Sequence, residues 1–214
     1  MKNILFVSNF YDGEVSYWVD SFKNKKSLTV EFEHLWLNKP KYGFIYRVFN
    51  KLNLELDVDY LNKRILRHIK SFNPDIVFIV KGNSIYPWTL KYIKYKYPNI
   101  KLVSFSNDNM CIWNNKSIYY HFGINFYDLV VSINISSYRK LEKFYYGRVL
   151  YIDKSYSEVH HKFIPVENKD YDCLFIGSYE KERFEIMKYL AENGVKVDIF
   201  GNMWNKAKTS DVSK

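Results

Sequence analysis

The chain has 214 residues, of which 47% are hydrophobic and 19% aromatic, and it carries a formal net charge of +9. This composition excludes a disordered chain, and the length is enough for one domain and part of a second. The apolar runs fall short of the ~18 residues that a membrane span needs, and no signal-peptide core is present. We therefore expect a cytoplasmic protein, peripheral on the inner membrane face at most.

The first third of the chain contains two predicted strands. Residues 3–9 form a continuous apolar run that ends in polar residues, which is typical of a strand buried on both faces. A Tyr-Asp-Gly turn follows, and then aromatic residues at helical spacing indicate a first helix (Tyr17, Trp18, Phe22). Residues 28–37 are β-rich and partly alternating, which predicts the second strand.

Strands and helices then alternate along the chain. A helix is predicted over 57–71, where apolar residues recur at i, i+3 and i+4 and the start is acidic. Further helices are predicted at 87–97 and 136–146, and further strands at 76–80, 101–105, 127–133 and 149–152. Six strands with intervening helices predict an α/β fold with a doubly wound parallel sheet, a Rossmann-like domain over 1–157.

A second, incomplete unit follows this domain. Residues 158–170 are polar, contain proline and lack periodicity, which indicates a linker. A strand at 172–176, a helix at 180–193 and a strand at 195–200 then form one βαβ unit. Because one such unit cannot bury both faces of its sheet, we expect 171–214 to be only the start of a second Rossmann-like domain.

Polar residues follow the carboxyl ends of the first-domain strands, where ligands bind in open parallel sheets. They predict an acceptor-side crevice lined by Asn9, Asp12, Gly13, Lys81, Asn83 and Asn107. Asp108 follows a buried strand there, and we take it as the candidate catalytic base. The alternative is that Asp108 is a turn former or a helix cap.

The turn Gly177-Ser178-Tyr179 lies between a strand and a helix whose first turn carries Lys181 and Arg183. Backbone N–H groups and cations at such a turn would bind a diphosphate. The alternative is a plain tight turn with a solvated arginine. The dinucleotide pattern GxGxxG and the P-loop pattern GxxxxGK[ST] are both absent from the sequence.

Other groups suggest little chemistry. Cys111 and Cys173 stand alone, so neither a disulfide framework nor a zinc site is indicated. His160 and His161 are adjacent and cannot form a helical metal pair, and we interpret both as surface linker residues rather than cleft residues. We expect no metal and no resident cofactor.

The positive charge favours an anionic partner, which would be nucleic acid, a phospholipid surface or a phosphate-bearing substrate. Between Lys39 and Lys51, aromatic residues alternate with lysine and arginine, a pattern that suits contact with an anionic membrane surface. The alternative for this stretch is a core helix whose lysines extend their charged ends to solvent.

The segment DCLFIGSYEKERFEIMKYLAENGVKVDIFGNMW, residues 172–204, resembles the start of the nucleotide-sugar-binding domain of CgeB-like glycosyltransferases. That family has a strand, a Gly-Ser turn, an arginine and a strand closing in glycine and tryptophan, here Gly177, Ser178, Arg183, Gly201 and Trp204. The upstream FSNDN, residues 105–109, resembles the family's acidic motif, although Asp108 is flanked by asparagines. The following YDLVVSIN, residues 127–134, resembles the family's next strand.

The resemblance implies a GT-B architecture, in which two Rossmann-like domains bind the acceptor and the sugar nucleotide without an essential metal. Donor contacts would come from Gly177, Ser178, Tyr179, Arg183, Gly201, Asn202 and Trp204. Members of the family continue beyond the position of Trp204, so we expect this chain to hold the first part of the donor domain.

These observations predict a glycosyltransferase of polysaccharide biosynthesis. It would move a sugar from a nucleotide sugar to a glycan, lipid-linked or protein acceptor. The alternative is a non-catalytic α/β binding module, or a truncated relic, that binds nucleic acid or another polyanion; nucleic acid is the less favoured partner.

Overall fold

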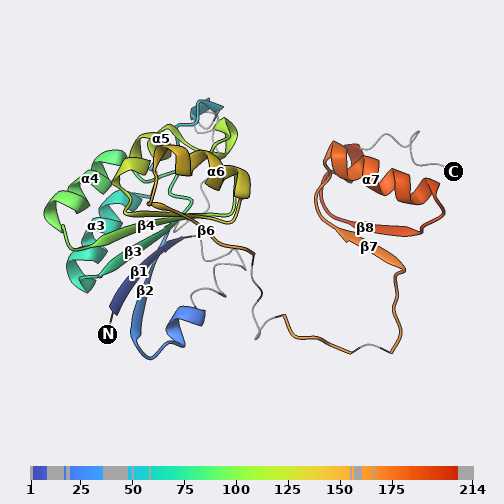
Figure 1. Ribbon diagram of the computed structural model, residues 1–214, viewed down its shortest axis with the longest axis horizontal. Coiled ribbons are helices and arrows are strands. Elements are labelled where there is room, and N and C mark those ends of the chain that lie inside the picture. The colour runs from blue at the N-terminus through green and yellow to red at the C-terminus, as the bar shows by residue number, and fades with distance from the viewer. Residues whose placement is uncertain are drawn as a thin grey trace. The chain divides into compact units, whose positions relative to one another are not determined.

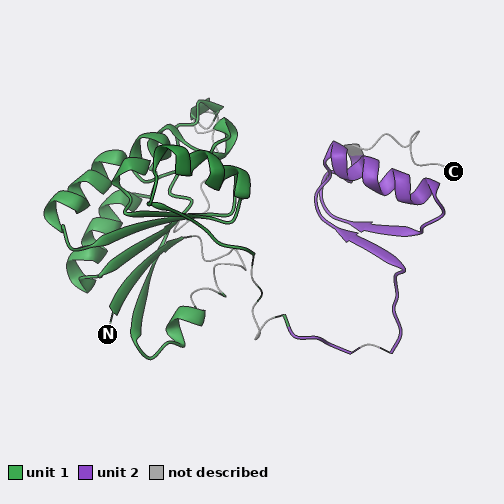
Figure 2. Ribbon diagram, in the orientation of Figure 1, with its two compact units in different colours: residues 1–161 green, residues 162–214 purple. Residues whose placement is uncertain are grey.

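The computed structural model describes residues 2–8, 17, 20–35, 48–49, 51–57, 59–154, 156, 161–165 and 167–206. The chain divides into two compact units, Met1–His161 and Lys162–Lys214 (Figure 2). The division falls within the range 158–170, in which the described residues form neither helix nor strand.

The first unit is built on a six-stranded, fully parallel sheet with the strand order β2-β1-β3-β4-β5-β6 (Figure 1). The strands are β1 (Lys2–Ser8), β2 (Leu28–His34), β3 (Ile76–Val80), β4 (Lys101–Ser106), β5 (Leu129–Ser132) and β6 (Val149–Tyr151). The central strands are the continuous apolar runs of the sequence, because both of their faces are covered. Leu5, Phe6 and Val7 of β1 are fully buried. The predicted α/β parallel-sheet fold is thus confirmed.

Four helices cover one face of this sheet (Figure 1): α3 (Leu61–Phe72), α4 (Pro87–Lys96), α5 (Ile118–Gly123) and α6 (Ile135–Phe144). Short 3₁₀ helices, η1 (Trp113–Asn115) and η2 (Ile124–Phe126), flank α5. The short helix that includes Phe22 packs on the opposite face, against Phe6 and Phe78. The helices therefore lie on both faces, as a doubly wound sheet requires.

Helix α3 begins at Leu61, four residues later than the sequence pattern predicts. Asp57 is not in the helix but caps it: its carboxylate accepts hydrogen bonds from the backbone N–H groups of Leu61 at 2.5 Å and Asn62 at 3.1 Å. An acidic residue near a helix start accepts hydrogen bonds from N–H groups that would otherwise be unpaired. The acidic residues thus correctly indicated that a helix begins nearby, but the predicted first residue of the helix was wrong.

The sequence pattern did not predict α5. The helix has only six residues, and most of them are aromatic or apolar, so the sequence shows no helical spacing of apolar and polar residues. Ser117 is its N-cap, and the Ser117 hydroxyl accepts a hydrogen bond from the N–H of Tyr120 at 3.0 Å.

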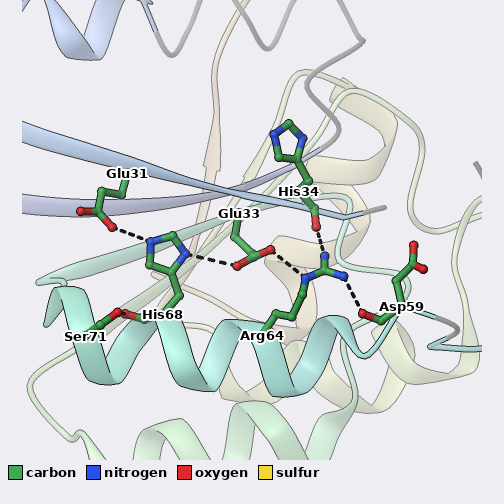
Figure 3. Close-up of polar contacts among 7 residues, drawn as sticks. All are labelled: Glu31, Glu33, His34, Asp59, Arg64, His68 and Ser71. Atoms are coloured by element: carbon green, nitrogen blue, oxygen red, sulfur yellow. Dashed lines mark hydrogen bonds and ion pairs between the residues drawn. The ribbon is translucent and has the colours of Figure 1, made fainter. Parts of the chain in front are cut away.

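The edge strand β2 is held to α3 by a polar network (Figure 3). The Nε of Arg64 lies 2.9 Å from Oε1 of Glu33, and the same guanidinium donates to the carbonyl oxygens of Asp59 and His34. His68 lies between two carboxylates, with Nε2 2.5 Å from Glu31 and Nδ1 3.2 Å from Glu33. These side chains thus fasten helix α3 to β2.

The second unit contains β7 (Cys173–Ile176), α7 (Lys181–Glu192), β8 (Val197–Phe200) and the 3₁₀ helix η3 (Trp204–Lys206). The strands β7 and β8 pair in parallel, with Cys173 opposite Val197 and Ile176 opposite Phe200. Strand β8 begins two residues later than predicted because the N–H of Val195 closes the end of α7 by donating to the Leu190 carbonyl at 3.0 Å.

No helix within the described parts of the chain has the length and apolar character to cross a membrane.

Candidate functional site

The loops after β3 and β4 meet at the carboxyl edge of the sheet in the first unit. There Nζ of Lys81 lies 2.9 Å from Oδ2 of Asp108, and both side chains are about two-fifths exposed (41% and 42%). Asp108, the candidate catalytic base, thus lies at this edge of the sheet and is paired with a cation from the neighbouring loop. Asn107 is exposed beside it.

Lys81 reaches Asp108 because the backbone reverses sharply after β3. Lys81 and Gly82 both have positive φ values, 63° and 64°. A Cβ at position 82 would lie 2.7 Å from Oη of Tyr127 and 3.3 Å from a methyl carbon of Ile79, so only glycine fits there.

The side chain of Asn83 links two loops, because both its amide nitrogen and its oxygen are hydrogen-bonded within the unit. Its side-chain amide donates to the Asn115 carbonyl at 3.1 Å, and its side-chain oxygen accepts from the N–H of Ser117 at 3.0 Å. The Ser117 hydroxyl in turn donates to the Asn83 carbonyl at 2.6 Å. These three bonds join the loop after β3 to the loop that leads into α5.

A residue that the sequence pattern did not single out, Glu55, lies close to the loop after β3. Ser84 donates its hydroxyl proton to the Glu55 carboxylate at 2.5 Å. Burial raises the pKa of Glu55 above its ordinary value of 4.5, although hydrogen bonds from Ser84 and Asn83 and the nearby charge of Lys81 act to lower it. A carboxyl group with a raised pKa accepts and releases protons nearer to neutral pH.

The signal that would have found Glu55 is its setting between Leu54 and Leu56, since a single acid between apolar neighbours outside a regular element is often half-buried. It was missed because the stretch around it reads as irregular, and proximity to Ser84 and Lys81 arises only in the folded chain.

Three predicted crevice residues, Asn9, Asp12 and Gly13, lie outside the described residues. The same holds for most of the stretch from Lys39 to Lys51, of which the structure describes residues 48, 49 and 51.

In the second unit, the seven predicted donor-binding residues converge on one turn. Gly177 donates its N–H to the Phe200 carbonyl at 2.8 Å, and Tyr179 donates its N–H to the Asn202 carbonyl at 2.9 Å. The indole Nε1 of Trp204 donates to the Gly177 carbonyl at 2.8 Å. Gly201 completes the contact, since a Cβ there would lie 1.9 Å from the Gly177 oxygen.

Aromatic rings and Arg183 brace the same turn. The rings of Tyr179 and Trp204 meet edge to face with centroids 5.5 Å apart. Nη1 of Arg183 donates to the Ser178 carbonyl at 3.0 Å, and Nη2 lies 3.2 Å from Glu180. The Arg183 side chain as a whole remains 40% exposed.

This geometry narrows the predicted diphosphate cradle. The N–H groups of Gly177 and Tyr179 are used inside the unit, so they are not donors for a phosphate. The remaining candidate donors are the N–H of Ser178, the N–H groups of the first turn of α7 and the partly exposed side chain of Arg183.

The two cysteines and His161 belong to no metal-ligand group in the described part of the chain. Among the described residues, no group of three or more His, Cys, Asp or Glu side chains could hold a metal ion. Both cysteines are free, and Cys111 Sγ lies 3.8 Å from the Ser137 carbonyl oxygen. His161 contacts the ring of Tyr17 at 5.3 Å, whereas His160 lies outside the described residues.

Comparison with known proteins shows similarity of structure but no match at the level of sequence. No family model matches the sequence, and no curated protein matches it. Among solved structures, the chain resembles the UDP-GlcNAc 2-epimerase from Neisseria meningitidis bound to UDP-GlcNAc, with 9% identity and a TM-score of 0.56 over 98% of this chain and 68% of that chain.

Two further solved structures are similar. The Methanocaldococcus jannaschii UDP-GlcNAc 2-epimerase in complex with UDP-GlcNAc and UDP is 10% identical, with a TM-score of 0.51 over 99% of this chain and 69% of that one. Acinetobacter baumannii MurG is 11% identical, with a TM-score of 0.48 over 97% of this chain and 68% of that one. The chain thus spans about two thirds of each.

The fold and these likenesses define a class of fold. The protein has a Rossmann-like α/β fold with a six-stranded parallel sheet, and the two UDP-GlcNAc 2-epimerases are similar to it in fold. At identities near 10%, the likeness shows the fold alone.

Proposed function

We propose that this chain is the acceptor-side domain and the first part of the donor domain of a GT-B sugar transferase that uses a nucleotide sugar. The observation that carries the proposal is the convergence of Gly177, Gly201 and Trp204 on one turn beside the start of α7, with Arg183 partly exposed. Two solved structures with the same fold are described as bound to UDP-GlcNAc, which supports a nucleotide sugar as the ligand.

In this proposal the second unit binds the diphosphate. The first-turn N–H groups of α7 carry the positive end of the helix dipole, and the partly exposed side chain of Arg183 adds a cation beside them. Trp204 and Gly201 do not touch the phosphate. They hold the Gly177 carbonyl, and with it the turn, in position.

The acceptor would bind in the crevice of the first unit. Glu55 would accept the proton from the attacking hydroxyl group, because its raised pKa makes it a better base than an ordinary carboxylate at the same position. Asp108, paired with Lys81, would hold an acceptor hydroxyl or orient that cation. The CgeB-like subfamily and the absence of a metal requirement belong to this proposal and rest on the sequence resemblance.

Nucleotide binding is the direct test. The chain is titrated with UDP, GDP and UDP-GlcNAc, followed by calorimetry and by ¹H–¹⁵N NMR. We expect saturable binding that shifts the amides of Ser178 and the first turn of α7. Arg183→Gln should weaken it about tenfold or more, because a hydrogen bond to a charged group contributes about 1.5–3 kcal/mol.

The matched control is Lys188→Gln, which removes a cation from the same helix two turns from the site. The proposal fails if none of the three nucleotides shifts the amides of the 177–183 segment, or if both variants weaken binding equally.

A second candidate function is epimerisation of the nucleotide sugar, because both structures with TM-scores above 0.5 are UDP-GlcNAc 2-epimerases. Incubation with UDP-GlcNAc, with and without added glycan acceptors, separates the two. A ¹H NMR spectrum that shows inversion at C2 without an acceptor favours the epimerase, and acceptor-dependent release of UDP favours the transferase.

A further inference from the structure

Helix α4 exposes an aromatic stripe. Its outward side chains include Trp88, Tyr92 and Tyr95, which are 61%, 47% and 86% exposed. They stand at positions i, i+4 and i+7 and therefore share one face of the helix. The opposite face holds Leu90 and Ile93, which are buried in the core of the unit. Helix α4 is therefore packed through its apolar face, and the three exposed rings are surface residues.

Cations flank this stripe. Lys91 and Lys96 are exposed on α4, one on each side of the three rings. Helix α3, which packs against α4, exposes Lys63, Arg67 and Lys70, again at i, i+4 and i+7. The outer surface of the two helices is thus an aromatic stripe beside a basic stripe.

The charge of this surface has one sign. Helices α3, α4 and α5 together contain seven Lys and Arg residues, four in α3 and three in α4, and no Asp or Glu. Two of the seven are half-buried and paired: Arg64 with Glu33 at 2.9 Å, and Lys94 with Asp128 at 2.8 Å. The other five are exposed, and their own helices supply no acid to pair with them.

The neighbouring helix extends the aromatic surface. Helix α5 packs against α4, and Phe122 on it is 61% exposed. Trp88 contacts the ring of Tyr119 from α5, with centroids 6.1 Å apart. The exposed rings are thereby spread over two helices on the helical layer of the unit.

We propose that this surface, Lys63, Arg67 and Lys70 of α3 with the aromatic stripe of α4, docks on an anionic phospholipid membrane. Tyrosine and tryptophan side chains favour the headgroup level of a bilayer, where the ring is in an apolar setting and the hydroxyl or N–H group is hydrated. Lysine and arginine beside them attract anionic headgroups. A nucleic acid is less well matched, because single strands bind in basic grooves with stacked bases and these rings stand on the outside of a helix. The inference does not depend on sugar transfer.

Vesicle flotation tests the proposal with the full chain. The probes are vesicles of phosphatidylcholine alone and of phosphatidylcholine with 30 mol% phosphatidylglycerol, in 0.1 M and 0.5 M NaCl. We expect binding only to the anionic vesicles and a marked loss at the higher salt, where the Debye length is shorter.

Two variants remove the two halves of the surface. Tyr92→Ser with Tyr95→Ser should weaken binding at least about tenfold. Arg67→Gln with Lys70→Gln and Lys91→Gln should weaken it about a hundredfold, since each cation near an anionic surface strengthens binding about fivefold. All substituted side chains are exposed, and circular dichroism and thermal unfolding verify the fold.

Matched controls come from α6 and the residues directly after it in the same unit. Phe144→Ser with Tyr146→Ser removes two exposed rings, and Arg139→Gln with Lys140→Gln and Lys143→Gln removes three exposed cations. Both controls should bind like the wild type.

Four outcomes overturn the proposal. They are no flotation with anionic vesicles, equal losses in the α6 controls, tighter binding to a single-stranded oligonucleotide than to anionic vesicles, and a wild-type dimer that Tyr92→Ser with Tyr95→Ser converts to a monomer.

Discussion

The ammonium group of Lys81 lies 2.9 Å from a carboxylate oxygen of Asp108, and this pair joins the loops that follow β3 and β4. Both side chains are about two-fifths exposed. Exposed ion pairs contribute about 0–1 kcal/mol to stability, so the pair does not hold the fold together. Its effect is instead on the charges that this edge of the sheet presents, because the ammonium and the carboxylate partly neutralise each other.

Asp108→Asn therefore separates function from folding. We expect the free energy of unfolding to change by less than about 1 kcal/mol. If Asp108 contacts the acceptor, the rate of sugar transfer falls at least about tenfold, because a charged hydrogen bond is lost. Urea unfolding and a UDP-release assay measure the two effects. Unchanged transfer kinetics would remove Asp108 from the site.

Glu55 predicts a pH dependence of stability. Burial raises the pKa of Glu55 above 4.5, so the folded chain holds this proton more tightly than the unfolded chain does. Stability is therefore highest below pH 4.5 as far as this group is concerned, and it falls as the pH rises through the raised value. Glu55→Gln has no proton to lose and should show a smaller fall. Urea unfolding between pH 4.5 and 8 measures the difference.

The control for this prediction is Glu142→Gln on α6, which should leave the pH slope unchanged. Glu55→Ala should destabilise the fold by about 1–3 kcal/mol, because the Ser84 hydroxyl then lacks its acceptor. Parallel pH curves for the wild type and Glu55→Gln would show that Glu55 titrates at its ordinary value.

Gly82→Ala should destabilise the first unit by about 2–4 kcal/mol. The substitution combines a positive φ with a Cβ 2.7 Å from Tyr127 Oη, so backbone strain and overpacking add. Gly147→Ala is the matched control: its φ is 74°, but no atom lies within 4 Å of the added Cβ, so only the backbone strain of about 1–2 kcal/mol remains. Thermal and urea unfolding measure both.

Tyr127→Phe should relieve the clash. The Tyr127 hydroxyl is buried and has no hydrogen-bond partner among the described residues, so its removal alone should be neutral or slightly stabilising. Gly82→Ala with Tyr127→Phe should recover the part of the loss that exceeds the Gly147→Ala value. A double variant no more stable than Gly82→Ala would show that the hydroxyl is not the obstacle.

The turn in the second unit depends on Trp204 and Gly201. Trp204→Phe keeps an aromatic ring beside Phe175 and Tyr179 but loses the hydrogen bond to the Gly177 carbonyl, which should destabilise the unit by about 1 kcal/mol. Gly201→Ala should unfold the turn, since the added Cβ overlaps the Gly177 oxygen. Amide hydrogen exchange of β7 and α7 measures both, and Gly194→Ala, which meets no atom within 4 Å, is the control for Gly201→Ala.

The network on β2 gives a test of buried charge (Figure 3). Arg64 and Glu33 have side chains only 12% exposed, so Arg64→Met should destabilise the fold by about 3 kcal/mol by leaving the carboxylate without its main partner. Arg64→Lys should also be less stable than the wild type, because one ammonium cannot serve the Glu33 carboxylate and the carbonyls of Asp59 and His34 together. Glu33→Gln with Arg64→Met should recover part of the loss.

Periodicity and breakers in the sequence were enough to predict the strands, most helices and the two turns that hold the candidate sites. They succeed because a strand buried on both faces must be apolar throughout, as 4–7 and 76–80 are, and because helices end where glycine, proline or asparagine stop them. The strand-turn-helix pattern around Gly177 likewise follows from local rules.

Tertiary structure decided the rest, because the relevant neighbours are far apart in the chain. Glu55 meets Ser84, and Lys81 meets Asp108, only after parallel strands have brought their carboxyl ends to one edge. Which backbone N–H groups of the Gly177 turn remain free depends on β8, more than twenty residues later. The spacing of the aromatic residues on α4 is visible in the sequence. Only the packing shows that this aromatic face is turned to solvent, because a face is core or surface according to what packs against it.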